Sequence, residues 1–158
     1  MNKLLSGYNK KMKSKLYPKY FETLPSWEDI IKDLDINLRE NESNVRVLPY
    51  LGFVTHNGNR IESVANITKE VQKLFPEKHT FTQHIYISMM SNSQNFGRHK
   101  DTMSVCIISA QGKITYIVED EEEITYDLEP GDMLFVPEGM YHTPVVSEPR
   151  AIVSIGFY

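Results

Sequence analysis

The sequence predicts a single, mostly β domain in which antiparallel strands form a sandwich or barrel and helices come only before it. Three observations lead to this prediction. The chain has 158 residues and 41% hydrophobic content, which suits one core of ordinary size. Helical spacing of apolar residues is confined to the part before residue 81. After that point, short segments rich in β-branched and aromatic residues follow one another closely.

Two helices are predicted in the first half. Ser26 precedes the segment WEDIIKDL and has capping-box spacing with Asp29, so we expect a helix over about residues 26–34. Apolar residues recur at helical spacing from Ile61 to Leu74, and this pattern stops before Pro76. Between these helices VRVLPYLGFV looks extended, and HNGN is typical of a turn.

Seven strands are predicted in the second half, most of them separated by Gly, Pro, Asn or charged clusters: FTQHIYISMM, TMSVCIISA, KITYIVE, EITYDL, DMLFVP, TPVVS and RAIVSIGFY. The acidic run EDEEE lies where a hairpin connection belongs, and we read it as a solvated loop. We therefore divide the single domain 1–158 into a basic arm over 1–20, a mixed helical segment over 21–80 and a β core over 81–158.

Charge and composition exclude several classes of protein. Six lysines precede the first acidic residue, Glu22, although the net charge is −4. Lysines without interleaved arginines are a weak nucleic-acid footprint, so a nucleic-acid partner is not expected. No apolar run approaches the roughly 18 residues of a membrane helix, and we expect a cytoplasmic protein without a membrane partner. The one cysteine, Cys106, cannot build a disulfide framework or a thiolate zinc site, and its apolar surroundings predict a buried side chain.

Metal-binding side chains come together in the segment FGRHKD. On a strand, residues i and i+2 face the same side, so His99 and Asp101 would present an imidazole next to a carboxylate. The pair alone is also compatible with a polar strand end and a hydrogen-bonded histidine. A third ligand is needed before a metal site can be inferred.

The stretch GDMLFVPEGMYH, which ends at His142, supplies that ligand through a resemblance. It resembles the second motif of the cupin superfamily, in which a glycine, a proline, a second glycine and a histidine follow at fixed spacing. Residues 84–158, roughly half of the chain, resemble cupin-type, Jumonji-like oxygenases that use iron(II) and 2-oxoglutarate. The resemblance implies a double-stranded β-helix, the cupin or jelly-roll barrel, with His99, Asp101 and His142 as metal ligands.

The chemistry of this ligand set agrees with the resemblance. Two imidazoles and one carboxylate leave about three positions of the metal open, as in non-haem iron(II) oxygenases, whereas structural zinc has a closed shell. In enzymes of this resemblance 2-oxoglutarate binds the metal through two oxygens. It is decarboxylated to succinate while a substrate carbon is oxidised.

A buried distal carboxylate of 2-oxoglutarate needs a cation, and the sequence offers two. Lys113 lies where Jumonji-like members place a basic residue, but only with a shift of one residue, because the ungapped position is Ile114. Arg150 starts the final strand eight residues after His142, where other 2-oxoglutarate oxygenases place an arginine. Its planar guanidinium group can bind a carboxylate through two parallel hydrogen bonds. Both remain candidates.

Hydroxyl and amide side chains near the site complete the set. Tyr86 and Ser88 share one face of a strand, and either hydroxyl could bind a cofactor carboxylate, although Tyr86 also suits the core. Asn92 and Asn95, in the loop SNSQNFG, could line the mouth of the site, but a turn is the favoured interpretation.

The favoured function is an iron(II) and 2-oxoglutarate dependent dioxygenase, specifically a hydroxylase. Two alternatives stay open: another metal-dependent cupin enzyme, a dioxygenase or isomerase that does not use 2-oxoglutarate, and a cupin-shaped binding module. The substrate, a protein side chain or a small molecule, is not encoded in any recognisable motif. Barrels of this kind often pair, so a homodimer is among the expected assemblies.

Overall fold

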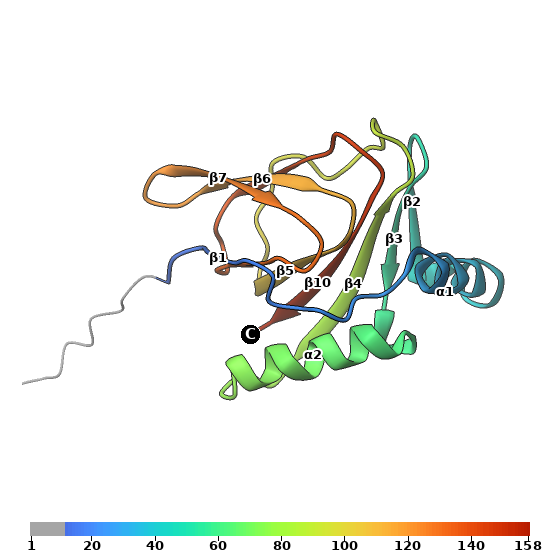
Figure 1. Cartoon of the computed structure of the whole chain (residues 1–158), viewed down its shortest axis with the longest axis horizontal. Coiled ribbons are helices and arrows are strands. Elements are labelled where there is room, and N and C mark those ends of the chain that lie inside the picture. Colours follow the sequence, from blue (N-terminus) through green and yellow to red (C-terminus); the bar gives the residue numbers. More distant parts are fainter. Residues whose placement is uncertain (1–11) are drawn as a thin grey trace, which may run out of the picture.

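The structure, a computed structural model, describes residues 12–158 and consists of two antiparallel sheets with two helices packed on one of them (Figure 1). The larger sheet has the strand order β1-β8-β5-β10-β4-β3-β2, and the smaller has the order β7-β6-β9. The strands are β1 Lys15–Tyr17, β2 Val45–Leu48, β3 Gly52–His56, β4 Phe81–Ser88, β5 Ser104–Gln111, β6 Ile114–Glu119, β7 Glu123–Leu128, β8 Met133–Val136, β9 His142–Val145 and β10 Arg150–Phe157.

Both predicted helices are present. Helix α1, Trp27–Glu40, begins at the predicted capping box, in which the Ser26 hydroxyl accepts from the Asp29 amide. It extends past the expected end because no glycine or proline interrupts it before Asn41. Helix α2, Glu62–Leu74, ends ahead of Pro76, whose ring disfavours helical geometry in the preceding residue.

The chain between the helices folds back on itself, which the extended interpretation of VRVLPYLGFV missed. Strands β2 and β3 pair as a hairpin, with the turn at Pro49–Leu51. Tyr50 and Leu51 have positive φ angles of 60° and 55°, a conformation that sequence reasoning assigns to glycine or asparagine. HNGN does leave the strand, and it leads into a short 3-10 helix, Gly58–Arg60.

Residues before 81 also contribute strands to the larger sheet, which the division of the sequence did not anticipate. The hairpin β2-β3 extends the sheet beyond β4, and β1 pairs with β8 at the opposite edge. The Lys19 amide donates to the Asp132 carboxylate, and the Phe21 amide donates to the Gly131 carbonyl. The part of the basic arm that the structure describes, from Met12 on, is therefore held along the sheet, while Lys3, Lys10 and Lys11 lie outside the described residues.

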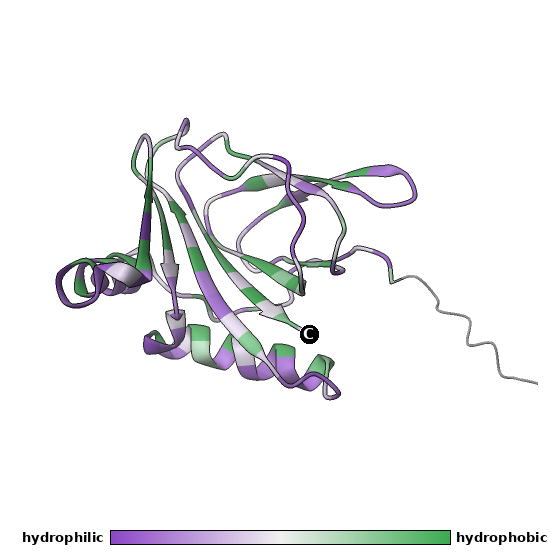
Figure 2. Ribbon diagram, turned by 180° about the vertical axis from the view of Figure 1, so that it is seen from behind, coloured by the Kyte–Doolittle hydropathy of each residue, from purple (hydrophilic) through white to green (hydrophobic). Residues whose placement is uncertain are grey.

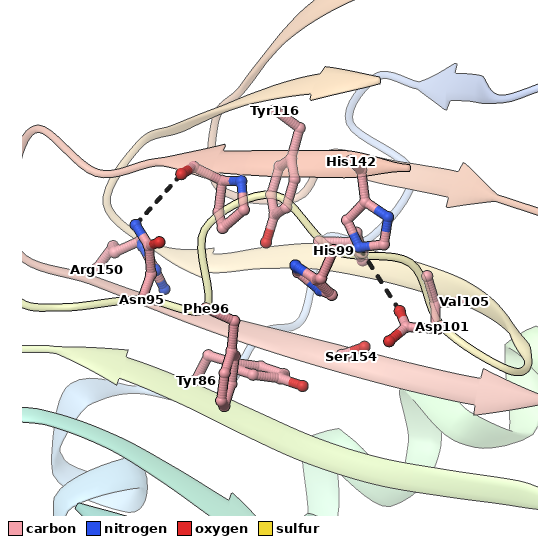
Figure 3. A pocket seen from close by; sticks show the side chains of 12 residues that line it. Tyr86, Asn95, Phe96, His99, Asp101, Val105, Tyr116, His142, Arg150 and Ser154 are labelled. Atoms are coloured by element: carbon pink, nitrogen blue, oxygen red, sulfur yellow. Dashed lines mark hydrogen bonds and ion pairs between the residues drawn. The ribbon is translucent and has the colours of Figure 1, made fainter. Parts of the chain in front are cut away.

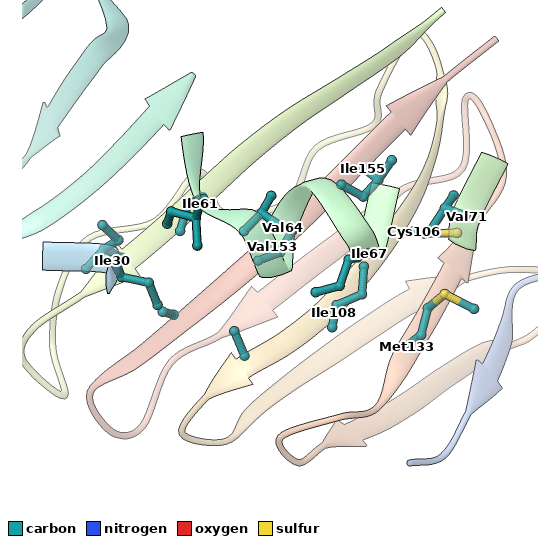
Figure 4. Packing of buried hydrophobic residues seen from close by; sticks show 14 of the residues in the cluster. Ile30, Ile61, Val64, Ile67, Val71, Cys106, Ile108, Met133, Val153 and Ile155 are labelled. Carbon is teal, nitrogen blue, oxygen red and sulfur yellow. The ribbon is translucent and has the colours of Figure 1, made fainter. Parts of the chain in front are cut away.

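The larger sheet separates two apolar layers. Helices α1 and α2 cover its outer face, where Ile30, Ile67, Val71, Val153 and Ile155 pack together (Figures 2 and 4). Cys106 belongs to this layer, as predicted, and burial raises the pKa of its thiol to about 12. Because side chains alternate along β4 and β10, the remaining residues of these strands face the smaller sheet. That inner face carries the candidate site.

In residues 12–158, the helices are too short or too polar to cross a lipid bilayer.

Candidate metal centre

His99, Asp101 and His142 come together between the sheets, although 43 positions separate the two histidines. One ligand atom from each residue lies within 4.8 Å of the others. Backbone pairing fixes this approach: the His99 amide donates to the His142 carbonyl at 3.0 Å, and the His142 amide donates to the His99 carbonyl at 2.8 Å. Within residues 12–158 this is the one group of three or more such side chains.

The segment that carries His99 and Asp101 is not a regular strand, contrary to the expectation from their spacing. His99 forms only an isolated bridge with His142, and Asp101 lies in irregular chain before β5. The Gly139 amide donates to the Asp101 carbonyl at 2.9 Å. Gly139 has a φ of 73°, a left-handed backbone conformation that strains residues with a side chain. Glycine adopts it readily, so the turn after β8 can present this amide to Asp101. Asp101 is thus oriented by the loop that follows β8.

Both imidazoles are oriented for metal binding. Nδ1 of His99 lies 2.8 Å from the Gly97 carbonyl, and Nδ1 of His142 lies 3.1 Å from the Met140 carbonyl. A carbonyl can only accept, so in the neutral rings Nδ1 carries the proton and Nε2 keeps a lone pair. Such a bond on the outer nitrogen holds the ring and makes Nε2 a better ligand.

Electrostatics favour the neutral form of His142. Burial lowers the pKa of its imidazole, and His99 acts in the same direction, while the Met140 carbonyl and Asp101 oppose them. Nε2 of His142 lies 3.6 Å from Oδ2 of Asp101. Two imidazoles beside a carboxylate form a donor set suited to a divalent transition metal.

A pocket extends from the three ligands toward Arg150, at the start of β10 (Figure 3). Its lining also includes an inner-face tyrosine from each sheet, Tyr86 on β4 and Tyr116 on β6. Apolar side chains and small polar groups complete the lining: Asn95, Phe96, Val105, Ile107, Pro144 and Ser154.

Arg150 is the buried cation of this pocket. Only 3% of the residue is exposed, and its Nε and Nη1 have no hydrogen-bond partner in the described part of the chain. Burial lowers the pKa of the guanidinium, partly opposed by Tyr116 and Tyr86. Unpaired buried charge is costly, so an arginine with two free donors at the end of a pocket indicates a place for an anion.

Lys113 lies elsewhere, contrary to its role as a candidate for the distal carboxylate. Its ammonium pairs with Glu129 at 3.1 Å and its side chain is 64% exposed. Ile114, the next residue, is the one that faces the core. The shift of one residue that Lys113 required does not occur, because it would bury an ammonium and expose an isoleucine.

The remaining predicted residues are placed as follows. Tyr86 lines the pocket, and burial raises the pKa of its hydroxyl, which therefore stays protonated. Ser88 is buried opposite Arg150 in the β4-β10 register, but it is not part of the pocket lining. Asn95 both stabilises the turn and lines the pocket. Its side-chain oxygen accepts a hydrogen bond from the Gly97 amide, and its side-chain amide donates to the Pro144 carbonyl.

Sequence reasoning missed Tyr116, Phe96 and Ser154. Alternation along the strands gives a signal for two of them, since Tyr116 shares a face with Ile114, and Ser154 shares a face with Ile152. Phe96 lies in a loop, where periodicity gives no indication.

Comparisons with known proteins agree with this architecture. Residues 114–158 match the family model described as a JmjC domain. The ribosomal oxygenase YcfD from Escherichia coli superposes with a TM-score of 0.73 at 20% identity, over 92% of this chain and 48% of YcfD.

The chain has the fold of that oxygenase. It spans about half the length of YcfD. A structure of YcfD with cobalt and 2-oxoglutarate gives a TM-score of 0.71 at 20% identity, over 92% of this chain and 48% of that one. A Pseudomonas putida prolyl-4-hydroxylase gives 0.56 at 11% identity, over 91% of each chain. These likenesses confirm the predicted jelly-roll barrel. A search of curated protein sequences gave no match.

Proposed function

We propose that this chain is an iron(II) and 2-oxoglutarate dependent oxygenase and that it hydroxylates its substrate. The observation that carries the proposal is the pairing, in one pocket, of a His-Asp-His ligand set with a buried arginine that lacks a partner. A metal-binding cupin without 2-oxoglutarate would need such an arginine only if its own substrate were an anion. Bound together, iron and 2-oxoglutarate activate dioxygen for oxidation of a carbon–hydrogen bond.

The residues of the pocket have distinct roles in this proposal. His99, Asp101 and His142 hold the metal through two Nε2 atoms and a carboxylate oxygen. Arg150 binds the distal carboxylate of 2-oxoglutarate through its unpaired donors. Tyr86 and Tyr116 both line the pocket, and burial raises the pKa of Tyr116 to about 12, so both hydroxyls remain available as donors.

The walls keep water from the reacting groups. Val105 and Ile107 on β5 and Pro144 on β9 cover the pocket between the two sheets, and all three are buried. Exclusion of water strengthens the interaction of Arg150 with a carboxylate and limits side reactions.

A protein side chain is the substrate class that we favour. The support is the likeness in fold to a ribosomal oxygenase and to a prolyl-4-hydroxylase, the second of which is named for an amino-acid residue. A small molecule is the alternative, and analysis of which compounds gain oxygen distinguishes the two.

The test is an anaerobic titration of the iron(II)-loaded protein with 2-oxoglutarate. We expect a weak charge-transfer band in the visible spectrum, followed by formation of succinate when oxygen is admitted. A metal-loaded protein that gives neither signal would contradict the proposal and favour a cupin enzyme that binds its substrate directly to the metal. A protein that fails to bind iron would favour a binding module.

A further inference from the structure

A row of polar side chains crosses the inner face of the larger sheet next to the metal centre. Ser154 on β10 lines the pocket and is opposite His84 on β4, which is in turn opposite His56 on β3. Directly opposed residues of antiparallel strands project from the same face. The His56 and His84 rings meet edge to face, with centroids 4.6 Å apart. The three side chains therefore form a continuous strip.

The strip has no hydrogen-bond partner in the part of the chain that the structure describes. Across residues 12–158, the side chains of His56, His84 and Ser154 form no hydrogen bond with another protein group, although each is half-buried. Most polar groups that are withdrawn from water find a partner. Of the three, Ser154 lines the pocket, and the two histidine rings continue from it across the same face of the sheet.

The strip lies at the end of the pocket away from Arg150. Along β10 the inner-face residues are Arg150, Ile152 and Ser154, and their partners on β4 are Ser88, Tyr86 and His84. Figure 3 shows Arg150 at one side of the pocket and Ser154 at the other, near Asp101. With 2-oxoglutarate bound at Arg150, the side near Ser154 and His84 is left for the molecule that is oxidised.

The outer end of the strip lies where the pairing of β2 with β3 stops. Strand β2 pairs with β3 only as far as Thr55, so His56 has no neighbour on that side in the sheet. A chain that lay along the strip would run from β3 across β4 to the pocket beside the metal centre. This geometry suits a polymer better than a small enclosed substrate.

Resting on the function proposed above, we infer that His84 and His56 form a subsite for the substrate, and that they bind an amide group of a polypeptide. A neutral imidazole has one donor and one acceptor, and an amide has both kinds of group in return. A carboxylate has only acceptors, and an ammonium group has only donors. Burial and the neighbouring His56 lower the pKa of His84, which keeps its ring neutral even though Asp101 opposes this shift.

The experiment compares variants on a proteolytic digest of bacterial ribosomal proteins, with the gain of one oxygen atom followed by mass spectrometry. His84→Phe keeps the size of the ring and removes both hydrogen-bonding groups, whereas His84→Asn keeps a donor and an acceptor. His56→Phe tests the outer end. His79→Phe is the matched control, because His79 is an exposed histidine remote from the pocket lining.

We expect KM for the oxidised peptide to rise about 3- to 10-fold in His84→Phe, the effect of losing one net hydrogen bond, and to recover partly in His84→Asn. His79→Phe should match the unmodified chain. The inference is overturned if both phenylalanine variants keep the original KM. It is also overturned if no peptide gains oxygen while succinate forms, a result that leaves the oxygenase assignment standing. Absence of succinate counts against the oxygenase itself.

Discussion

Replacing Arg150 by methionine tests the cofactor assignment directly. The guanidinium has two buried donors, Nε and Nη1, without partners among the residues that the structure describes. A hydrogen bond between charged groups contributes about 1.5–3 kcal/mol, so two of them correspond to about 3–6 kcal/mol and to about a hundredfold to ten-thousandfold in Kd. Arg150→Met should weaken 2-oxoglutarate binding by at least the lower of these factors.

The assay is the anaerobic titration described above, with the charge-transfer band as the signal and iron content measured in parallel. Lys113→Met is the matched control, because Lys113 is an exposed cation paired with Glu129, and its replacement should leave Kd unchanged. Without 2-oxoglutarate, Arg150→Met should also raise the free energy of unfolding by about 1–3 kcal/mol, since an unsatisfied buried cation is removed. The reasoning is refuted if Arg150→Met binds 2-oxoglutarate as tightly as the unmodified chain does.

Three further predictions concern the metal, a buried acid and a turn. His99→Ala should leave two metal ligands, so iron content after dialysis should fall at least tenfold; retention of iron would show that His99 is not a ligand. Burial raises the pKa of the Asp33 carboxyl above its ordinary value of 3.8, so the folded state binds a proton more tightly than the unfolded state does. The free energy of unfolding therefore falls as pH rises through that raised pKa. Asp33→Asn should remove this fall in denaturant titrations at several pH values, and an unchanged slope would contradict the assigned cause. A Cβ at Gly112, where φ is 69°, would collide with the Pro149 carbonyl. Gly139 has a similar φ of 73° but open space around a Cβ, so Gly112→Ala should lower the melting temperature more than Gly139→Ala does. Equal decreases in melting temperature would contradict this reasoning.

The sequence predicted well those helices and strands whose apolar residues recur at regular spacing. Alternating apolar residues and clear breakers located the strands from β4 to β10 within a few residues, and the capping box located the start of α1. The hairpin β2-β3 was missed because its turn uses Tyr50 and Leu51 with positive φ, which no turn signature identifies. β1 was missed because a three-residue strand is too short to show a period.

For the site, the resemblance was needed to predict that His99, Asp101 and His142 converge, because spacing alone joined only His99 and Asp101. The sequence could not decide whether Lys113 or Arg150 is the cation for the distal carboxylate of 2-oxoglutarate. It depends on which face of a strand each side chain occupies, and a turn one residue longer would exchange Lys113 and Ile114. The strip of His56 and His84 depends on register between strands that are far apart in the chain, and neither residue has a motif of its own.

The pairing of β1 with β8 has a consequence for how the chain can be shortened. β8 is the apolar segment MLFV, buried along its whole length, and β1 is its neighbour on the side away from β5. Cutting the chain after Tyr17 would leave an uncharged strand with free amides and carbonyls along one side. Such a strand readily recruits a strand from another molecule. We therefore expect the three residues Lys15–Tyr17 to protect the sheet from aggregation.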